Sequence, residues 1–239
     1  MKNCSNFSVI IVYFCTALNN HILLLETTGD TCSAAICRDG EIVSYNFEDG
    51  KKHSSVITLL IAQVCKEANL LLKETHAAAL NIGPGSYTGL RVGLSAAKGI
   101  CYANEIPLIS VNGFEILYHL LSKENPANEA NFIIPVIHAR KDEFFFSVLN
   151  KDGEVIEASS YLLANDLTMH AQANYPGFIF CGEDRDLFTK FANQNIEYIQ
   201  TEKINATHLA TIANQKYINS MFADLAYSEP LYIKEFQSY

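Results

Sequence analysis

The chain has 239 residues, of which 49% are hydrophobic and 18% are charged. This length and composition exclude a disordered or collagen-like chain and are typical of a globular protein with one large domain or two small lobes. Twenty-six acidic residues against seventeen basic residues give a net charge of −9. That charge excludes a protein that grips a nucleic-acid backbone by itself.

The first twenty residues hold one basic residue, Lys2, and an apolar stretch over 7–17 that is too short to span a bilayer. The stretch has the length of a signal-peptide core, but it lacks a clear small-x-small cleavage site. We interpret residues 1–20 as an N-terminal extension or a start codon placed too far upstream, with an export signal as the alternative. Without export, we expect a cytoplasmic protein with no membrane-spanning segment.

The next part of the chain predicts a meander of three strands followed by helices that alternate with short strands. The three strands are 21–26, 31–38 and 41–47, and Asp39-Gly40 is a two-residue hairpin turn. The elements that follow are a helix over 56–72 capped by residues 53–55, a strand at 77–82, a helix at 89–103, a strand at 107–110 and a helix capped by Asn112.

A similar order restarts after a polar linker at 122–130. The second set comprises strands near 133–139, 144–150 and 154–162, a helix at 166–173, a strand at 177–181, a helix at 183–192, a strand at 196–199 and a closing helix at 206–224. The order βββαβα therefore occurs twice, which is the duplicated plan of the actin-like ATPases and sugar kinases. We expect an actin-like α/β fold with an N-terminal lobe over 21–121 and an abbreviated C-terminal lobe over 131–239. A two-layer α/β fold without duplication is the alternative.

The cysteines and histidines argue against metal chemistry. Seven cysteines occur without a C-x-x-C pair, which indicates free thiols in a reducing compartment. No two histidines have the spacing of a helical zinc site. We therefore predict no metal site.

A glycine-rich stretch over 83–91 lies between a predicted strand and a predicted helix, where unpaired backbone N–H groups can hold an anion. Its G-x-G-x-x-x-G spacing differs from the dinucleotide fingerprint, and no P-loop Lys-Ser or Lys-Thr pair follows. Close packing of a helix on a strand is an equally good explanation of the glycines. The candidate anion or nucleotide residues here are Gly83, Gly85, Ser86, Thr88 and Arg91.

The stretch NIGPGSYTGLRVGLSAAKGI, with ILLLETTGDTCSAAI upstream and IPLISVNGFEIL downstream, resembles the TsaB family of bacteria. The resemblance runs from about His21 to Leu121. In the second half, VIHARKDEFF resembles the family's D-A-R-x-x-E-V-Y segment, with Arg140 and Glu143 in place but His138 where an aspartate is usual. The tail at 229–233 (EPLYI) resembles the family's P-x-Y-L ending.

The resemblance implies a non-catalytic subunit that forms a heterodimer with TsaD, its catalytic paralogue, in making N6-threonylcarbamoyladenosine on tRNA. It also implies that the ATPase TsaE docks on the heterodimer, that ATP is used by the complex rather than bound firmly by this chain, and that tRNA is contacted indirectly. The alternative is an autonomous actin-like phosphotransferase that uses the 83–91 loop together with Glu26 and Thr27. Glu26 resembles the acidic residue of the first phosphate loop in actin-like kinases, and a strand-to-turn junction is the plainer explanation.

The resemblance places the partner interface on the first two helices. Two adjoining apolar stripes on residues 56–72 are compatible with this, because one stripe can face the sheet while the other meets a partner helix. Burial of both stripes inside the chain is the alternative. The predicted interface residues are Val56, Ile57, Leu60, Ile61, Val64, Leu71, Leu94 and Cys101. We also expect weak self-association of the isolated chain through this surface.

Overall fold

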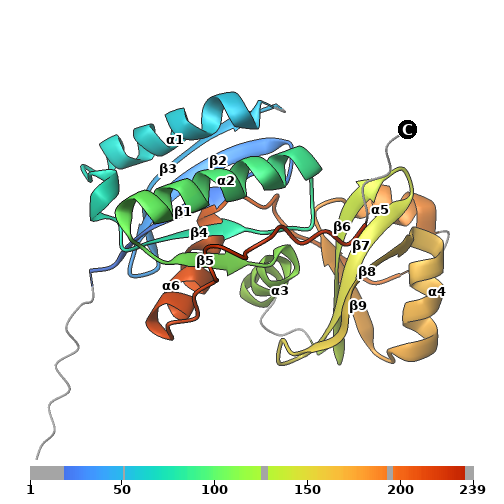
Figure 1. Cartoon of the computed structure of the whole chain (residues 1–239). Coiled ribbons are helices and arrows are strands. Elements are labelled where there is room, and N and C mark those ends of the chain that lie inside the picture. Colours follow the sequence, from blue (N-terminus) through green and yellow to red (C-terminus); the bar gives the residue numbers. More distant parts are fainter. Residues whose placement is uncertain (1–18, 51, 125–128, 193–195, 235–239) are drawn as a thin grey trace, which may run out of the picture.

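The structure is a computed structural model that describes residues 19–50, 52–124, 129–192 and 196–234. Two lobes lie side by side (Figure 1), and none of the helices in these ranges is long and apolar enough to cross a membrane. The predicted extension at 1–20 lies outside the described residues except for Asn19 and Asn20. The predicted linker at 122–130 begins within a helix that ends at Glu124, and 125–128 are outside the description.

The first lobe is built on a five-stranded sheet of order β3-β2-β1-β4-β5. Its strands are β1 (His21–Glu26), β2 (Thr31–Arg38), β3 (Glu41–Asp49), β4 (Ala77–Asn81) and β5 (Leu108–Val111). The first three strands are antiparallel, and β1, β4 and β5 are parallel. Asp39 and Gly40 both have positive φ, as a tight two-residue hairpin turn requires. The predicted strands of this lobe are confirmed.

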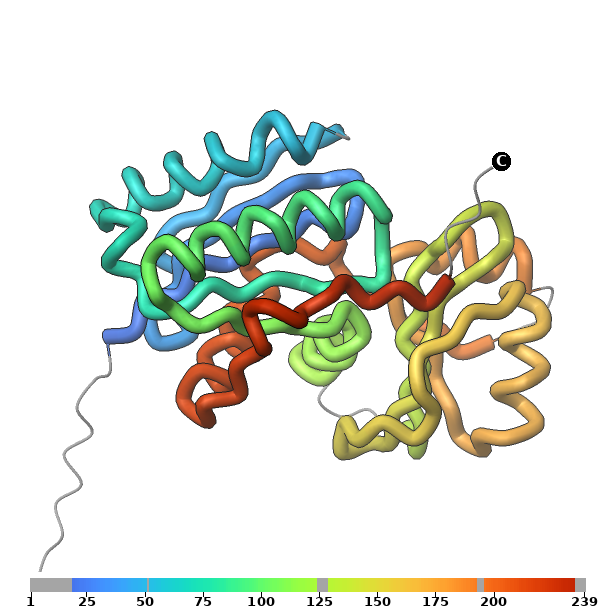
Figure 2. Tube along the Cα trace, in the orientation of Figure 1, coloured from blue at the N-terminus to red at the C-terminus, as the bar shows by residue number. Residues whose placement is uncertain are grey.

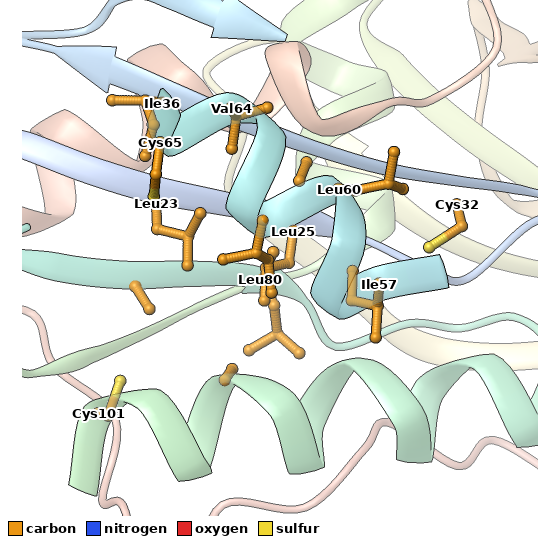
Figure 3. Close-up of a cluster of buried hydrophobic side chains, with 14 of the residues drawn as sticks. Leu23, Leu25, Cys32, Ile36, Ile57, Leu60, Val64, Cys65, Leu80 and Cys101 are labelled. Atoms are coloured by element: carbon orange, nitrogen blue, oxygen red, sulfur yellow. The ribbon is translucent and has the colours of Figure 1, made fainter. Parts of the chain in front are cut away.

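Helices α1 (His53–Glu67) and α2 (Tyr87–Asn104) cover one face of this sheet (Figure 1). Figure 3 shows Ile57, Leu60 and Val64 of α1 among the buried side chains between α1, the sheet and α2. They form one buried cluster with sheet residues such as Leu23 and Ile36. The alternative in which both stripes of α1 lie inside the chain is therefore correct.

The predicted partner interface on this layer is wrong for most of its residues. Six of the eight predicted interface residues are at most 8% exposed, namely Ile57, Leu60, Ile61, Val64, Leu94 and Cys101. Val56 is half-buried, and Leu71, at 58% exposure, follows the end of α1. The predicted helix starts three residues late and ends too late, because the chain turns after Ala68 and forms only a 3-10 turn, η1 (Leu72–Glu74).

The second lobe repeats the topology of the first with the order β10-β9-β6-β7-β8. Its strands are β6 (Phe132–Arg140), β7 (Glu143–Asn150), β8 (Val155–Leu163), β9 (Phe178–Gly182) and β10 (Tyr198–Gln200). Helices α4 (Ala164–Asn174) and α5 (Arg185–Ala192) have 11 and 8 residues, against 15 and 18 in α1 and α2. The duplicated βββαβα plan with an abbreviated second lobe is confirmed.

Two segments cross between the lobes. Helix α3 (Gly113–Glu124) packs Leu117 and Leu121 against Ile133 of the second sheet. In the opposite direction, the 3-10 turn η2 (Ala206–Leu209) and helix α6 (Ala210–Ile218) cover the second face of the first sheet. The predicted closing helix at 206–224 is thus shorter than expected, and its apolar side chains belong to the core of the first lobe.

Candidate functional site

A cleft of about 810 Å³ lies between the lobes. Its walls come from the loop after β1, from the start of α2, from the β6–β7 turn and from the C-terminal segment. The polar residues that line it include Thr28, Asp30, Ser86, His138, Arg140, Glu143, Glu183, Asp184, Lys203 and Lys234. Of the candidate anion or nucleotide residues, Gly85 and Ser86 line this cleft, whereas its lining does not include Glu26, Thr27, Gly83, Thr88 and Arg91.

Glu26 ends β1 with a fully buried carboxyl group. One carboxylate oxygen accepts a hydrogen bond from the Thr28 backbone N–H, and the other accepts one from Asn81 Nδ2 at 2.8 Å. Burial raises the pKa of Glu26 to about 7, against the pull of these hydrogen bonds. Both oxygens are thus committed to holding the β1–β2 loop, residues 27–30, on the end of β4, which supports the plainer explanation of this residue.

The glycines of the 83–91 stretch bring α2 against the β1–β2 loop. A Cβ at Gly85 would lie 2.5 Å from the Thr28 carbonyl oxygen, and one at Gly89 would overlap the Thr27 carbonyl oxygen. The Thr27 hydroxyl donates a 2.8 Å hydrogen bond to the Gly89 carbonyl. Close backbone packing therefore accounts for these two glycines, as the alternative to an anion cradle predicts.

The first turn of α2 is capped from within the chain. Ser86 is the N-cap, and its hydroxyl oxygen accepts a hydrogen bond from the Gly89 N–H at 3.3 Å. The Ser86 N–H in turn donates to the Thr28 carbonyl at 2.7 Å. Gly83 takes a positive φ beside the side chain of Leu90, and Thr88 is exposed. The loop thus joins the β1–β2 loop and α2 into one rigid corner of the cleft.

Arg91 lies on the exposed side of α2 and meets aromatic partners. Its guanidinium carbon lies 4.0 Å from the centre of the Tyr87 ring, and its Nε donates to the Tyr232 hydroxyl at 2.9 Å. A further hydrogen bond joins Arg91 to the Tyr87 hydroxyl. The sequence indicated an anion as a candidate partner of Arg91 and gave no sign of Tyr232, which lies 141 positions further along the chain.

The β6–β7 turn forms the facing wall. Arg140 Nε lies 3.1 Å from Glu143 Oε2, and Lys234 Nζ lies 2.7 Å from the same oxygen. The hydrogen bond from Lys234, with a smaller contribution from Arg140, lowers the pKa of Glu143. The His138 ring nitrogen Nε2 lies 3.0 Å from the Lys141 carbonyl oxygen. Glu143, which the sequence marked only by its place in the family's segment, is therefore a half-buried ion-pair partner.

The floor of the cleft holds residues that the sequence did not single out. Glu183 accepts a hydrogen bond from the Ile204 N–H at 2.8 Å, and burial raises the pKa of its carboxyl group. Tyr198 lines the same region and is 5% exposed. Within the described ranges no three His, Cys, Asp or Glu residues group as metal ligands do. Gly182, which ends β9 directly before Glu183, is the sequence signal that could have drawn attention to this floor.

Comparison with known proteins places the chain in a family. The family model for TsaD, tRNA N6-adenosine threonylcarbamoyltransferase, matches residues 48–235. A relative from Haemophilus influenzae named tRNA threonylcarbamoyladenosine biosynthesis protein TsaB is 23% identical over 226 residues, which are 90% of this chain and 94% of the relative. The chain belongs to the TsaB family, within the wider TsaD family. The resemblance read from the sequence is confirmed.

Solved structures support the fold of this TsaB-family chain. YeaZ from Pseudomonas aeruginosa superposes with a TM-score of 0.72 at 20% identity, covering 89% of this chain and 99% of YeaZ. The activator of 2-hydroxyisocaproyl-CoA dehydratase from Clostridium difficile, solved with bound ADPNP, gives a TM-score of 0.50 at 8% identity over 84% of this chain and 97% of the activator. The actin-like architecture is therefore confirmed.

Proposed function

We propose that this chain is a non-catalytic partner subunit in the formation of N6-threonylcarbamoyladenosine at position 37 of tRNAs that read ANN codons. The observation that carries the proposal is the match to a TsaB relative over 90% of the chain. A second observation supports the non-catalytic role. The acidic residue that an actin-like kinase would use at this position is Glu26, and its two oxygens accept hydrogen bonds from Thr28 of the β1–β2 loop and from Asn81 of β4.

We place the partner, TsaD, on the outer face of the α1 and α2 layer. This face differs from the buried stripe predicted from the sequence, because it is turned toward solvent. Leu59 of α1 is 63% exposed and Tyr102 of α2 is 81% exposed. Gly99 of α2 has no atom within 4 Å of the position of a Cβ, so a partner helix can approach its backbone closely. Full burial of Leu59 by a partner contributes about 2 kcal/mol.

The other members of the complex follow from the same proposal. TsaE docks on the TsaD heterodimer, ATP is consumed by the complex without firm binding to this chain, and TsaD supplies most of the tRNA contact. The net charge of −9 supports the last point, since phosphate backbones repel such a surface. In the absence of TsaD, the exposed face around Leu59 supports weak homodimers, which light scattering detects as a rise of mass with concentration.

A binding experiment tests the interface. Leu59→Asp places a charge in the proposed contact and weakens binding to matched-species TsaD by at least about 100-fold in calorimetry, since several kcal/mol are lost when a charge is buried unpaired. Met169→Asp is the matched control, because Met169 is 56% exposed on α4 of the other lobe. Circular dichroism establishes that both variants are folded. Equal TsaD affinity in the two variants contradicts the proposed face.

The cleft supports a second candidate function, an autonomous phosphotransferase. Its volume of about 810 Å³ is within the range of small-molecule sites. This candidate predicts that the isolated chain binds ATP and that Glu26→Ala abolishes the binding. Lack of ATP binding at millimolar concentration excludes it and leaves the partner-subunit proposal intact.

A further inference from the structure

The C-terminal segment after α6 crosses from the first lobe to the second. We call residues 223–234 the strap. Figure 2 shows it, in dark red, running beside α2 and β5 and then across to the second lobe. The motif at 229–233, which resembles the TsaB ending, lies in the strap. The proposed partner role does not account for this motif.

The strap is fixed firmly to the first lobe. The Ala223 N–H donates to the Leu108 carbonyl of β5 at 2.8 Å, which makes an isolated antiparallel bridge. The Leu231 N–H donates to the Ile82 carbonyl at 2.8 Å. Between these points, Lys98 Nζ of α2 donates to the Ala226 carbonyl at 3.0 Å. Because β5, α2 and Ile82 after β4 all belong to the first lobe, this end of the strap moves with the first lobe.

The strap then passes the mouth of the cleft and ends in the second lobe. Tyr232 accepts the hydrogen bond from Arg91, and its ring lies 5.1 Å from that of Tyr87. Lys234 Nζ reaches Glu143 Oε2 at 2.7 Å and lies 4.6 Å from the centre of the Tyr161 ring on β8. The Lys234 and Glu143 side chains are only 20% and 19% exposed, so solvent screens this ion pair less than a pair on the open surface.

Within the ranges that the structure describes, the chain also crosses between the lobes at two other places. One is the packing of α3 on the second sheet through Leu117 and Ile133. The other is the segment before η2, where the Ile204 N–H binds Glu183 and the Ala206 N–H binds the Ser33 hydroxyl at 2.9 Å. Two crossings allow two lobes to rotate about a hinge, and a third connection across the cleft restrains that rotation.

We propose that the strap is a latch that holds the two lobes closed around the cleft, with the Lys234–Glu143 ion pair as its releasable end. The ends of the latch differ in strength. Among the described residues, backbone hydrogen bonds and the contacts of Tyr232 hold it on the first lobe, whereas the Lys234–Glu143 ion pair and the contact of Lys234 with the Tyr161 ring hold it on the second. Opening therefore begins at Lys234, and it frees the β6–β7 turn while the strap stays on α2.

Single-molecule fluorescence transfer on the isolated full chain tests the latch. The donor and acceptor are attached to unnatural amino acids at positions 59 and 169, which are exposed and lie on different lobes. Wild type is expected to give one high-transfer population. Lys234→Ala is expected to add a low-transfer population, and so is a chain that stops after Ser228. Sodium chloride at 1 M is expected to shift wild type in the same direction, because it screens the ion pair.

Two further variants make the result decisive. Lys216→Ala is the matched control, because Lys216 pairs with Glu115 at 2.7 Å and has an 18% exposed side chain, but this pair joins α6 to α3 and neither partner lines the cleft. The charge swap Lys234→Glu with Glu143→Lys is expected to restore the wild-type distribution only in part, because Arg140 stays beside position 143 and the contact of Lys234 with the Tyr161 ring is lost. An unchanged distribution in Lys234→Ala and in the truncated chain overturns the latch, as does an equal shift in Lys216→Ala. Because TsaD is absent from this experiment, its outcome is independent of the partner proposal.

Discussion

The close approach of α2 to the β1–β2 loop makes a sharp prediction about two glycines of the same helix. In Gly89→Ala the new methyl group collides with the Thr27 carbonyl oxygen, which belongs to the backbone and cannot rotate away. Relief of this overlap costs about 1–3 kcal/mol, and the Thr27–Gly89 hydrogen bond, worth about 1 kcal/mol, is lost as the helix moves. The higher helix propensity of alanine stabilises the variant by about 1 kcal/mol. The expected net destabilisation is about 1–3 kcal/mol.

Gly99→Ala is the matched control, because its Cβ has no atom within 4 Å. Only the propensity gain applies there, so this variant is expected to be about 1 kcal/mol more stable than wild type. Urea unfolding followed by circular dichroism measures both free energies of unfolding. A Gly89→Ala protein as stable as Gly99→Ala refutes the packing explanation. The glycine-rich stretch is then better explained as an anion-binding loop.

Two other predictions concern buried groups of the first lobe. Val64→Asp places a carboxylate at a position with 0% exposure, so the monomer is expected to lose several kcal/mol of stability. Its urea midpoint is expected to be much lower than that of Leu59→Asp. Similar midpoints for the two variants contradict the burial of this stripe of α1. Burial raises the pKa of Glu26 from its ordinary 4.5 to about 7, so the native state binds more protons than the unfolded state between these pH values. The free energy of unfolding of wild type should therefore fall as pH rises through that window, by about 3 kcal/mol relative to that of Glu26→Gln between pH 4 and 8. Parallel pH profiles of the two proteins contradict the raised pKa of Glu26.

The strands and helices were predictable where the signal is local. Strands such as 31–38 are marked by an apolar run that ends at a turn dipeptide, and Asn112 accepts the capping hydrogen bond from Phe114 as expected. The two lobes follow from the repeated order of such elements. These features depend on residues that are neighbours in the sequence, so no knowledge of tertiary contacts is needed to find them.

The contacts that make the site are long-range and left no local signal. The second stripe of α1 is apolar, but the sequence does not say whether α2 or a partner covers it. Helix α6 follows the second lobe in the chain and yet packs Ile212 on the first sheet, beside residues of η2 and α3. Lys234 meets Glu143 across 91 positions, and neither residue belongs to a charge pattern that predicts the pair. The glycines were ambiguous for a similar reason, since their neighbour, the β1–β2 loop, is distant in the chain.

We propose that TsaD needs this chain to modify tRNA. Mass spectrometry of N6-threonylcarbamoyladenosine on an unmodified tRNA, incubated with the carbamoyl-adenylate synthase, TsaD and TsaE of the same species, with and without this chain, tests this role. We expect the modified nucleoside to form only when the chain is present, and we expect Leu59→Asp to abolish the effect while Met169→Asp preserves it. Equal yields of the modified nucleoside with and without the chain contradict the proposed role.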